Sequence, residues 1–425
     1  MASLHDHPPH GLACNLLQPP TLFPSSRLRQ ATWTKEATVS RPCLRRRRQR
    51  LKAIHAKSSS TELPDIVKGL GQLLWGQSLP PGALVGAVRS VWTSAWAVMM
   101  KQLAPSDNQG GYQRPQSKFR NRLPSPISSA DYGRYHLYVS LTCPWAHRTA
   151  IVHSLKGLGD AVPISVTVPG DTGLWEFRPH KDISTEDLQQ CTLLPSVDRA
   201  HQRRLLKEVY KLRKGGYDGR ATVPMLWDSH EREIINNESA DIIEILNADF
   251  NIFSSEPQLD LSPEHLQRDI EKWNNLIYTS VNNGVYRCGF AQGQGAYDEV
   301  IKMLFSTLDI LDEHLASSKF LCGEQLTLAD IRLFTTLYRF DPVYYVLFKC
   351  SKKKLVEYPS LYRYLCQIFQ IPGVSATCDL LTIMDGYYKV LFPLNPGGIR
   401  PVIPASSESA CLLVGSVQKQ ISLRP

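Results

Sequence analysis

The sequence predicts an α/β domain followed by an all-helical domain. Short apolar runs rich in β-branched residues alternate with helical patterns from Tyr135 to about Asn247. After Phe250 the strand-like runs cease, and the apolar residues recur at helical spacing. The chain has 425 residues, which is enough for two or three domains, and 43% of them are hydrophobic, as in a globular protein with a sizeable core.

Residues 1–60 differ from the rest of the chain in charge. They hold eleven of the 48 Lys and Arg residues and two of the 39 Asp and Glu residues, so the remaining 37 basic and 37 acidic residues cancel. The net charge of +9 therefore gives no indication that the folded part binds nucleic acid. The segment is poor in acidic residues, rich in Ser, Thr, Pro and Arg, and lacks a continuous apolar run. We expect a disordered transit peptide for the chloroplast, with the mitochondrion or the cytoplasm as alternative locations. A disordered basic arm that binds nucleic acid or directs nuclear import is the alternative to a transit peptide.

Residues 61–128 form an N-terminal extension before the α/β pattern. Its longest apolar stretch, 83–100, is interrupted by Arg89 and by Ser and Thr residues. It falls short of the roughly 20 apolar residues that a membrane-spanning helix needs. We expect a packed or surface-lying helix, no membrane span, and a polar extended segment over 108–128.

The α/β domain is predicted over 129–250. In chain order, its elements are a strand at 135–140, a helix at 143–157, a strand at 163–168, a helix at 197–213, strands at 222–227 and 233–236, and a helix at 238–247. An insertion at about 169–195 interrupts them. The order β-α-β-α-β-β-α is that of a thioredoxin-like domain.

The all-helical domain is predicted over 251–401, with a loop-like tail at 402–425. Its helical patterns fill 263–283, 296–316, 327–347 and 357–371. The third pattern opens with Thr327 and Asp330 at the spacing of a capping box.

Cys143 stands where the first strand gives way to the first helix, in the run Cys143-Pro144-Trp145-Ala146-His147-Arg148. Proline suits the first position of a helix. The free N–H groups and the positive end of the helix dipole then face the sulfur and favour the thiolate. We expect His147 and Arg148 to add positive charge. The pattern predicts a nucleophile, with a buried capping cysteine as the alternative.

Ten cysteines are scattered through the chain without CxxC spacing or paired His residues. This usage predicts neither a metal site nor a disulfide framework. No second cysteine follows Cys143 two residues on, so a single reactive thiol would form a mixed disulfide with a small thiol and need another thiol to release it.

Two further positions suit a thiol-bearing ligand. Val223-Pro224 opens a strand, and a cis proline there lets the preceding backbone face the ligand; a plain strand-initiating proline is the alternative. Glu238-Ser239 begins a helix, where a carboxylate and a hydroxyl beside free N–H groups can hold an ammonium and a carboxylate. Both residues are also simply good first-turn residues.

Aromatic residues offer a third kind of candidate. Tyr286 can donate a hydrogen bond to an oxygen of an aromatic substrate, and a buried structural role suits it equally. Tyr387, Tyr388 and the stretch 340–345 are more typical of a core than of a pocket.

In combination these residues resemble the Xi-class glutathione transferases, the glutathionyl-hydroquinone reductases, from about Gly111 to Pro401. The most specific blocks are Cys143 through Arg148, Asn236-Asn237-Glu238-Ser239, and Asn282 through Arg287. The resemblance implies a thioredoxin-like domain followed by an all-helical glutathione-transferase domain. It also implies glutathione as co-substrate and a homodimer.

The resemblance assigns roles to individual residues. It makes Cys143 the nucleophile. Trp175, Val223, Pro224, Glu238 and Ser239 would bind glutathione, and Tyr286, with Tyr387 or Tyr388, would border the quinol pocket. Enzymes of this kind attack the glutathionyl sulfur of a glutathionylated hydroquinone, release the hydroquinone, and are then resolved by a second glutathione.

The chain departs from the family's pattern at two places. The tail helix, 384–391, lacks the His residues that flank the tyrosines in many members, and Val346-Leu347 stands where a Gly-His pair is usual. Both lie on the acceptor side, so we expect them to bear on the choice of quinol. A general thioltransferase or dehydroascorbate reductase using Cys143, and a non-catalytic ligand-binding protein, are the competing hypotheses.

Overall fold

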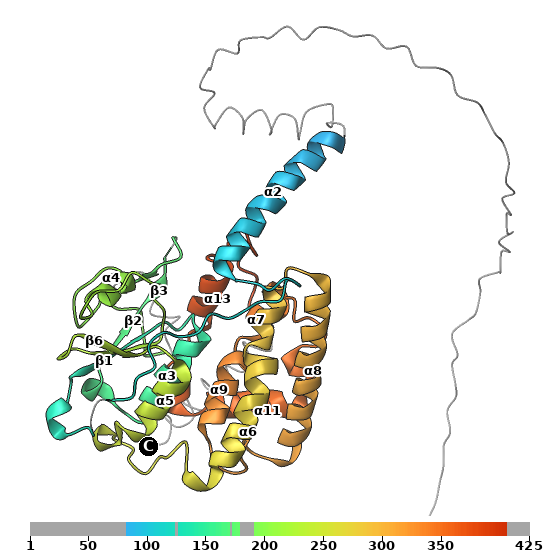
Figure 1. Cartoon of the computed structure of the whole chain (residues 1–425). Coiled ribbons are helices and arrows are strands. Elements are labelled where there is room, and N and C mark those ends of the chain that lie inside the picture. Colours follow the sequence, from blue (N-terminus) through green and yellow to red (C-terminus); the bar gives the residue numbers. More distant parts are fainter. Residues whose placement is uncertain (1–81, 124–125, 171, 179–190, 406–425) are drawn as a thin grey trace, which may run out of the picture. The chain divides into compact units, whose positions relative to one another are not determined.

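The computed structural model describes residues 82–123, 126–170, 172–178 and 191–405 (Figure 1). The chain divides into two units, 1–79 and 80–425, and the described residues all belong to the second. The predictions for the leader and for residues 406–425 of the tail lie outside the described residues.

A four-stranded sheet forms the centre of the α/β part. Its strands are β1 (Tyr135–Val139), β2 (Ile164–Val166), β5 (Met225–Asp228) and β6 (Glu233–Asn236), in the order β2-β1-β5-β6. β1 is parallel to β2 and antiparallel to β5, and β6 is antiparallel to β5. Every residue of β1 and β5 is buried, which explains why both strands are mostly apolar; their polar residues, His136 and Asp228, are hydrogen-bonded. The predicted thioredoxin-like order is confirmed.

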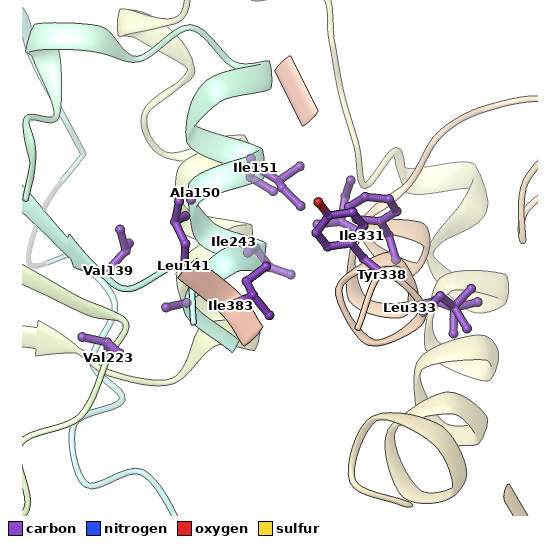
Figure 2. Packing of buried hydrophobic residues seen from close by; sticks show 14 of the residues in the cluster. Val139, Leu141, Ala150, Ile151, Val223, Ile243, Ile331, Leu333, Tyr338 and Ile383 are labelled. Atoms are coloured by element: carbon purple, nitrogen blue, oxygen red, sulfur yellow. The ribbon is translucent and has the colours of Figure 1, made fainter. Parts of the chain in front are cut away.

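Two helices of the α/β part lie between the sheet and the helical part (Figure 1). They are α3 (Pro144–Leu155) and α5 (Ser239–Ala248), which pack against each other, while α3 also packs on α9 (Leu328–Leu337). Eleven of the twelve residues of α3 are buried, as expected of a helix covered on both sides. One apolar core therefore runs through both parts, from Val139 and Ile151 to Ile331 (Figure 2).

Over its described length the second part consists of helices joined by loops, with no strand of its own, which confirms the predicted all-helical domain. Its α-helices, besides α9, are α6 (Gln267–Ile277), α7 (Gly284–Gly289), α8 (Gln294–Ser317), α10 (Tyr345–Leu347), α11 (Pro359–Phe369), α12 (Pro372–Ser375) and α13 (Leu380–Tyr388). The capping box that opens α9 is present, with the Thr327 N–H donating to the Asp330 carboxylate at 2.8 Å. Short 3₁₀ turns lie at Ser129–Asp131, Gly159–Ala161, Asn251–Phe253, Glu264–Leu266 and Leu355–Glu357.

Two of the predicted helices are divided by wider, π-helical turns. These are η5 (Tyr278–Asn282), after α6, and η6 (Phe340–Tyr344), after α9. Within η6, Pro342 has no N–H to offer the helical ladder, and the N–H groups of Val343 and Tyr344 both donate to the Arg339 carbonyl at 3.1 Å. The helical patterns predicted over 263–283 and 327–347 are therefore present, but each changes from α-helical to π-helical winding at these turns.

The predicted helix at 197–213 shrinks to α4 (Leu206–Lys211). The buried carboxylate of Asp198 accepts hydrogen bonds from the N–H groups of Ala200, His201 and Arg203 at 3.0–3.2 Å. Gln202 has a left-handed backbone, with φ of 53°. A side chain that bonds its own neighbouring N–H groups competes with the helix, so residues 198–205 form a loop.

The predicted insertion contains a small hairpin. Its strands are β3 (Val168–Pro169) and β4 (Trp175–Glu176), which pair antiparallel apart from the main sheet. Residues 179–190 of the insertion lie outside the described residues.

The N-terminal extension contributes a helix and a strap. The helix, α2 (Gly82–Leu103), is exposed over 86–95, and near its end Trp96 donates its indole N–H to the Pro393 carbonyl at 3.1 Å. Residues 105–123, called the strap below, reach the open edge of β6 at Phe119–Asn121. Asn121 N–H donates to the Ile235 carbonyl at 3.1 Å, and Asn237 N–H donates to the Phe119 carbonyl at 2.9 Å.

No helix within the described ranges combines the length and hydropathy required to cross a membrane.

Candidate functional site

Cys143 lies at the junction of β1 and α3. Its backbone is extended at the N-cap position of α3, and Pro144 is the first helical residue. A tight turn, closed by Cys143 N–H donating to the Ser140 carbonyl at 3.1 Å, presents the side chain at the helix start. The thiol is partly exposed, so a ligand can reach it. The sulfur thus meets the free N–H groups and the positive end of the α3 dipole, as the sequence predicts.

The peptide bond between Val223 and Pro224 is cis, and it faces the thiol. The Cys143 thiol donates to the Val223 carbonyl across 3.7 Å. Val223 itself is buried, directly before β5. The arrangement places main-chain hydrogen-bonding groups beside the sulfur, where an extended thiol-bearing ligand can pair with them.

His147 does not supply the positive charge predicted for it. Its ring is fully buried, and Arg339 Nη1 donates to its Nδ1 at 3.1 Å. Its Nε2 lies 2.9 Å from the Thr377 hydroxyl, which donates to the Val374 carbonyl and therefore accepts from Nε2–H. Burial, then the neighbouring Arg339 charge, holds the pKa of His147 well below its usual value. The ring is therefore neutral at pH 7, and that prediction is wrong.

Arginine supplies the charge near α3 instead. Arg148 is buried and its burial lowers its pKa to about 9, so it remains protonated at pH 7. Its guanidinium lies 4.4 Å from the centre of the Trp145 ring, and the guanidinium of Arg114, on the strap, lies 3.9 Å from it. Arg148 also donates to the Asn282 side-chain oxygen at 2.9 Å, which ties α3 to the helical part.

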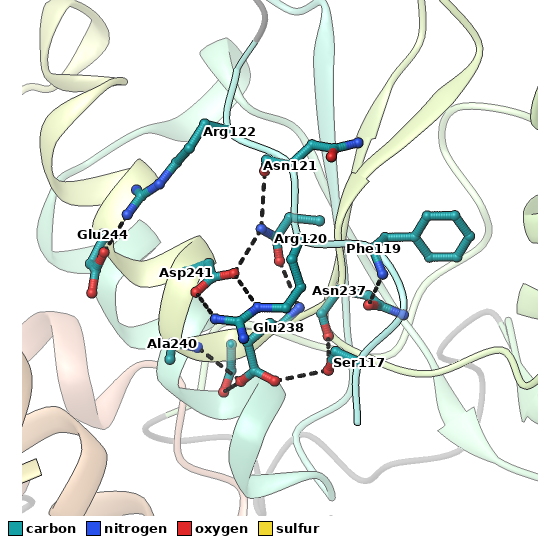
Figure 3. A network of polar contacts seen from close by, with 12 residues as sticks. Ser117, Phe119, Arg120, Asn121, Arg122, Asn237, Glu238, Ala240, Asp241 and Glu244 are labelled. Carbon is teal, nitrogen blue, oxygen red and sulfur yellow. Dashed lines mark hydrogen bonds and ion pairs between the residues drawn. The ribbon is translucent and has the colours of Figure 1, made fainter. Parts of the chain in front are cut away.

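Glu238 caps α5, and its carboxylate is held from two sides (Figure 3). One oxygen accepts from the Ala240 N–H at 3.3 Å, and the other accepts from the Ser117 hydroxyl at 2.8 Å. Ser239 is buried at the first turn. The carboxylate, a hydroxyl and the α5 N-terminus lie together, and this combination can hold an ammonium and a carboxylate of one ligand.

The sequence did not single out Ser117 for this site. Its only signal was its place in the polar extended segment predicted over 108–128. Nothing local pairs Ser117 with Glu238, because the contact depends on the strap lying along β6. Arg120 forms a two-point ion pair with Asp241, at 2.7 and 2.9 Å, and so fixes the strap to α5 (Figure 3).

Three tyrosines form a hydrogen-bonded chain beside this region. Tyr286 Oη, from α7, lies 2.5 Å from Tyr387 Oη, from α13, and Tyr387 Oη lies 3.1 Å from Tyr344 Oη, from η6. Tyr286 is partly exposed, whereas Tyr344 and Tyr387 are buried. Burial raises the pKa of all three, and the Cys143 thiolate further raises those of Tyr286 and Tyr344. At pH 7 they are neutral phenols that can donate protons, and Tyr286 and Tyr344 lie near enough to Cys143 to be affected by its charge.

The other predicted site residues lie apart from this chain of phenols. Tyr388 is buried, and its hydroxyl donates to the Pro342 carbonyl at 3.0 Å. Trp175 lies half-buried on β4, paired with Pro169, and within the described part of the chain no hydrogen bond or ring contact joins it to Cys143. The sequence placed Tyr344 in a stretch typical of a core and so missed its contact with Tyr387.

The geometry combines a nucleophile with acids. A thiol at a helix N-terminus can attack a sulfur or carbon centre. Neutral phenols at its side can protonate the group that leaves. Among the residues that the structure describes, no group of three or more His, Cys, Asp and Glu side chains is arranged to hold a metal ion.

Two family profiles match the chain. The profile of the glutathione S-transferase N-terminal domain matches residues 142–249, and that of the C-terminal domain matches residues 294–365. The first spans Cys143, the cis proline and Glu238, and the second spans most of α8, α9 and α11.

Two curated proteins are similar over most of their length. The glutathionyl-hydroquinone reductase YqjG of Escherichia coli is 40% identical over 328 residues, covering 75% of this chain and 94% of that protein. The glutathionyl-hydroquinone reductase PcpF of Sphingobium chlorophenolicum is 38% identical over 320 residues, covering 75% of this chain and 96% of that protein.

Solved structures agree with these matches. The glutathione transferase Xi from Phanerochaete chrysosporium has a TM-score of 0.65 and 38% identity, covering 71% of this chain and 95% of that one. The glutathione-bound structure of E. coli YqjG has a TM-score of 0.61 and 40% identity, covering 68% of this chain and 92% of that one.

Proposed function

Because this chain belongs to the Xi-class glutathione transferases, the family of the glutathionyl-hydroquinone reductases, we propose that it removes glutathione from glutathionyl-hydroquinones. The observation that carries the proposal is the partly exposed thiol of Cys143 at a helix N-terminus, faced by the chain of neutral phenols that begins at Tyr286. The thiol suits attack on sulfur, and the phenols suit protonation of an aromatic leaving group.

The glutathionyl part of the substrate is held by the α/β part. Glu238 and Ser239, with the N-terminus of α5, hold the charged γ-glutamyl end. The backbone of Val223 pairs with the cysteinyl part, and Trp175 completes the binding set. This pose brings the substrate sulfur toward Cys143, because the Val223 carbonyl already lies 3.7 Å from the thiol.

The first step breaks the carbon–sulfur bond. The Cys143 thiolate attacks the glutathionyl sulfur, a disulfide forms, and the electron pair of the broken bond passes to the ring carbon of the hydroquinone. An aryl carbanion is a poor leaving group unless it is protonated. The Tyr286 phenol, backed by Tyr387, donates that proton, and the free hydroquinone leaves.

The second step restores the enzyme. A second glutathione thiolate attacks the glutathionyl sulfur of the mixed disulfide and displaces the Cys143 thiolate, giving oxidised glutathione. The proton lost by this glutathione returns to the tyrosines. Overall, one glutathionyl-hydroquinone and one glutathione give one hydroquinone and one oxidised glutathione.

Three finer features extend the proposal. The basic, acid-poor leader supports delivery to the chloroplast, with the mitochondrion or cytoplasm as alternatives. Family membership supports a homodimer. The altered tail helix and Val346-Leu347 support a quinol preference different from that of members with His residues there.

The test follows both products of the reaction. The full chain is incubated with glutathione and glutathionyl-menadiol, and free menadiol and oxidised glutathione are measured by chromatography. We expect turnover in the wild type, none in Cys143→Ser, and near-normal turnover in Cys366→Ser, a partly exposed cysteine on α11. Cysteine-dependent reduction of a small mixed disulfide or of dehydroascorbate, without quinol turnover, would instead identify a thioltransferase. No turnover in either assay would identify a binding protein.

A further inference from the structure

Arg339 places a fully buried positive charge against the turn that carries Cys143, and its charge acts on two of the tyrosines, Tyr344 and Tyr387. It lies directly after α9, before η6. Its Nη2 donates to the Leu141 carbonyl at 2.5 Å, and its Nη1 donates to the Thr335 carbonyl at 2.8 Å and to His147 Nδ1 at 3.1 Å. None of these acceptors is a carboxylate, and Nε has no partner in the described part of the chain. The guanidinium therefore carries its charge into the interior.

Burying a charge is costly, so its surroundings must favour it. Thr335 lies in the last turn of α9, and its carbonyl belongs to the negative end of that helix dipole. His147, being neutral, adds no competing charge. These contacts satisfy two of the guanidinium nitrogens without placing a negatively charged side chain against them.

One of those neighbours is the turn that carries the nucleophile. Leu141 lies two residues before Cys143, and its carbonyl is the acceptor of the shortest of the three contacts. Leu141 is itself buried, within the core shared by the two parts (Figure 2). Arg339 thus fixes the peptide preceding Thr142 and Cys143 from the side of the helical part.

The other neighbour is the inner end of the tyrosine chain. The Arg339 carbonyl accepts from the N–H of Tyr344, which fixes the start of η6. The Arg339 charge lowers the pKa of Tyr344 and Tyr387, against the larger opposite effect of their burial. The partly exposed Tyr286 is at the outer end, so the chain runs from the substrate side inward to the cation.

We propose that Arg339 is a positioning residue for the reaction, which holds the Cys143 turn through Leu141 and stabilises the anion left on the tyrosine chain. This inference rests on the proposed function. When Tyr286 gives its proton to the ring carbon, one negative charge remains on the phenols. Tyr387 can donate to that oxygen and Tyr344 to Tyr387, so the charge moves toward Arg339. The proton of the second glutathione later restores the chain.

The test compares two reactions of the full chain that share Cys143 and the glutathione site. One is reduction of glutathionyl-menadiol, which needs ring protonation. The other is reduction of the mixed disulfide of glutathione and 2-mercaptoethanol, whose leaving thiolate needs no proton donor. We expect Arg339→Met to lower kcat about 100-fold for the quinol, at the lower end of the range seen when one preorganised charge-stabilising group is removed, with little change in KM. For the disulfide, where only the hold on the Cys143 turn is lost, we expect a fall of about 10-fold. Arg339→Lys keeps the charge. It should therefore restore most of the wild-type ratio of kcat for the quinol to kcat for the disulfide.

Arg332→Met is the matched control. Arg332 is a mostly buried arginine on α9, and it donates to the Ala240 carbonyl at 3.4 Å. It contacts neither the Cys143 turn nor the phenols, so the ratio should stay unchanged. Far-UV circular dichroism and thermal melting establish that each variant folds, and Arg339→Gln replaces Arg339→Met if the latter does not.

Two results would overturn the inference. One is an equal loss of both reactions in the neutral variant, which a purely structural role predicts. The other is an Arg339→Lys variant that behaves like the neutral one. A wild type without quinol turnover contradicts the proposed function itself, and that result is seen before any Arg339 variant is compared.

Discussion

The cysteines of the described chain differ in how their sulfur atoms are surrounded. Cys143 is partly exposed at a helix N-terminus, whereas Cys288, Cys350 and Cys378 are buried. Burial raises the pKa of the Cys191 thiol to about 12 and that of the Cys322 thiol to about 11, so both stay protonated at pH 7. Cys143 therefore combines partial exposure with a place at a helix N-terminus, which is the setting of a reactive cysteine.

This difference predicts selective alkylation. Iodoacetamide at less than one equivalent and pH 7 should modify Cys143 before the other six described cysteines, and prior incubation with oxidised glutathione should protect it. Peptide mass spectrometry measures the extent at each site. Modification of Cys191 or Cys322 at a rate equal to that of Cys143 would contradict the assignment of the nucleophile.

Ser117 predicts an effect on glutathione binding. Its hydroxyl donates to the Glu238 carboxylate at 2.8 Å, and Ser117→Ala leaves that oxygen without this donor. A hydrogen bond to a charged group is worth about 1.5–3 kcal/mol when buried and less at a partly exposed site, so KM for glutathione should rise roughly 3- to 10-fold with kcat nearly unchanged. Steady-state kinetics with varied glutathione measures this, with the exposed neighbour Gln116→Ala as control. A fall in kcat at constant KM is the contrary result.

At the residue scale, the sequence predicted what local chemistry determines. Cys143 and Glu238-Ser239 are read from their places at helix starts, where backbone N–H groups are free. The charge of His147 was predicted wrongly because its burial comes from Arg339 and Thr377, which are about 190 and 230 residues away along the chain. The contacts of Ser117 and Arg339 likewise exist only once distant segments meet.

At the scale of elements, strand β1 contains a buried histidine that predicts acid sensitivity. Burial lowers the pKa of His136 to about 4, and its Nε2 lies 2.8 Å from the Ser165 hydroxyl on β2. Below about pH 6.5 the unfolded chain binds a proton at this ring while the folded chain does not. The neutral ring's contribution to stability is therefore present above pH 6.5 and is lost as the pH falls toward 4.

Urea unfolding at pH 7.5 and pH 5 measures this loss. His136→Asn removes the ring, so the fall in unfolding free energy between the two pH values should be smaller than in the wild type by about 2 kcal/mol. The exposed His265→Asn is the control and should lose as much stability as the wild type. Equal losses in His136→Asn and the wild type would show that another group causes the acid sensitivity.

Element boundaries were predictable where periodicity alone sets them. The sheet strands and α8 follow their apolar patterns closely. The loop at 198–205 and the turn η6 do not, because one buried carboxylate at Asp198 and one missing N–H at Pro342 redirect the backbone hydrogen bonds. Effects that depend on one side chain or one missing N–H group do not alter the periodicity of apolar residues, so the sequence pattern did not indicate them.

At the scale of the whole molecule, a buried polar contact joins the two parts. The Asn282 side-chain oxygen accepts from Arg148, and its amide donates to the Arg332 carbonyl at 3.0 Å and to the Thr336 hydroxyl at 2.8 Å. The apolar core is also continuous across the same boundary (Figure 2). We expect the two parts to unfold together.

Asn282→Ala tests that coupling. It leaves the buried Arg148 charge without its side-chain acceptor, so the unfolding free energy should fall by about 3 kcal/mol. Urea unfolding followed by tryptophan fluorescence and by far-UV circular dichroism should remain one coincident transition. Asn283→Ala is the matched control, because the Asn283 side-chain oxygen has no partner in the described structure, and it should cost much less. Two separated transitions in the wild type would contradict the coupling.

The succession of two domains was predictable because each has its own period of apolar residues. The course of the strap was not predictable. It is an extended polar segment without a repeating apolar pattern, so its sequence does not indicate which element it pairs with. Its partner is the edge of β6, about 115 residues further along the chain.

The strap also protects the protein against aggregation at high protein concentration. β6 ends the sheet, and an uncovered end strand offers its N–H and C=O groups to any other extended chain. Phe119 and Asn121 occupy those groups from within the same molecule, and the neighbouring Arg120 and Arg122 place charge beside them. A chain shortened to remove the strap therefore exposes the unpaired edge of β6, and we expect it to aggregate more readily. The same chain loses Ser117, so its affinity for glutathione should fall as well.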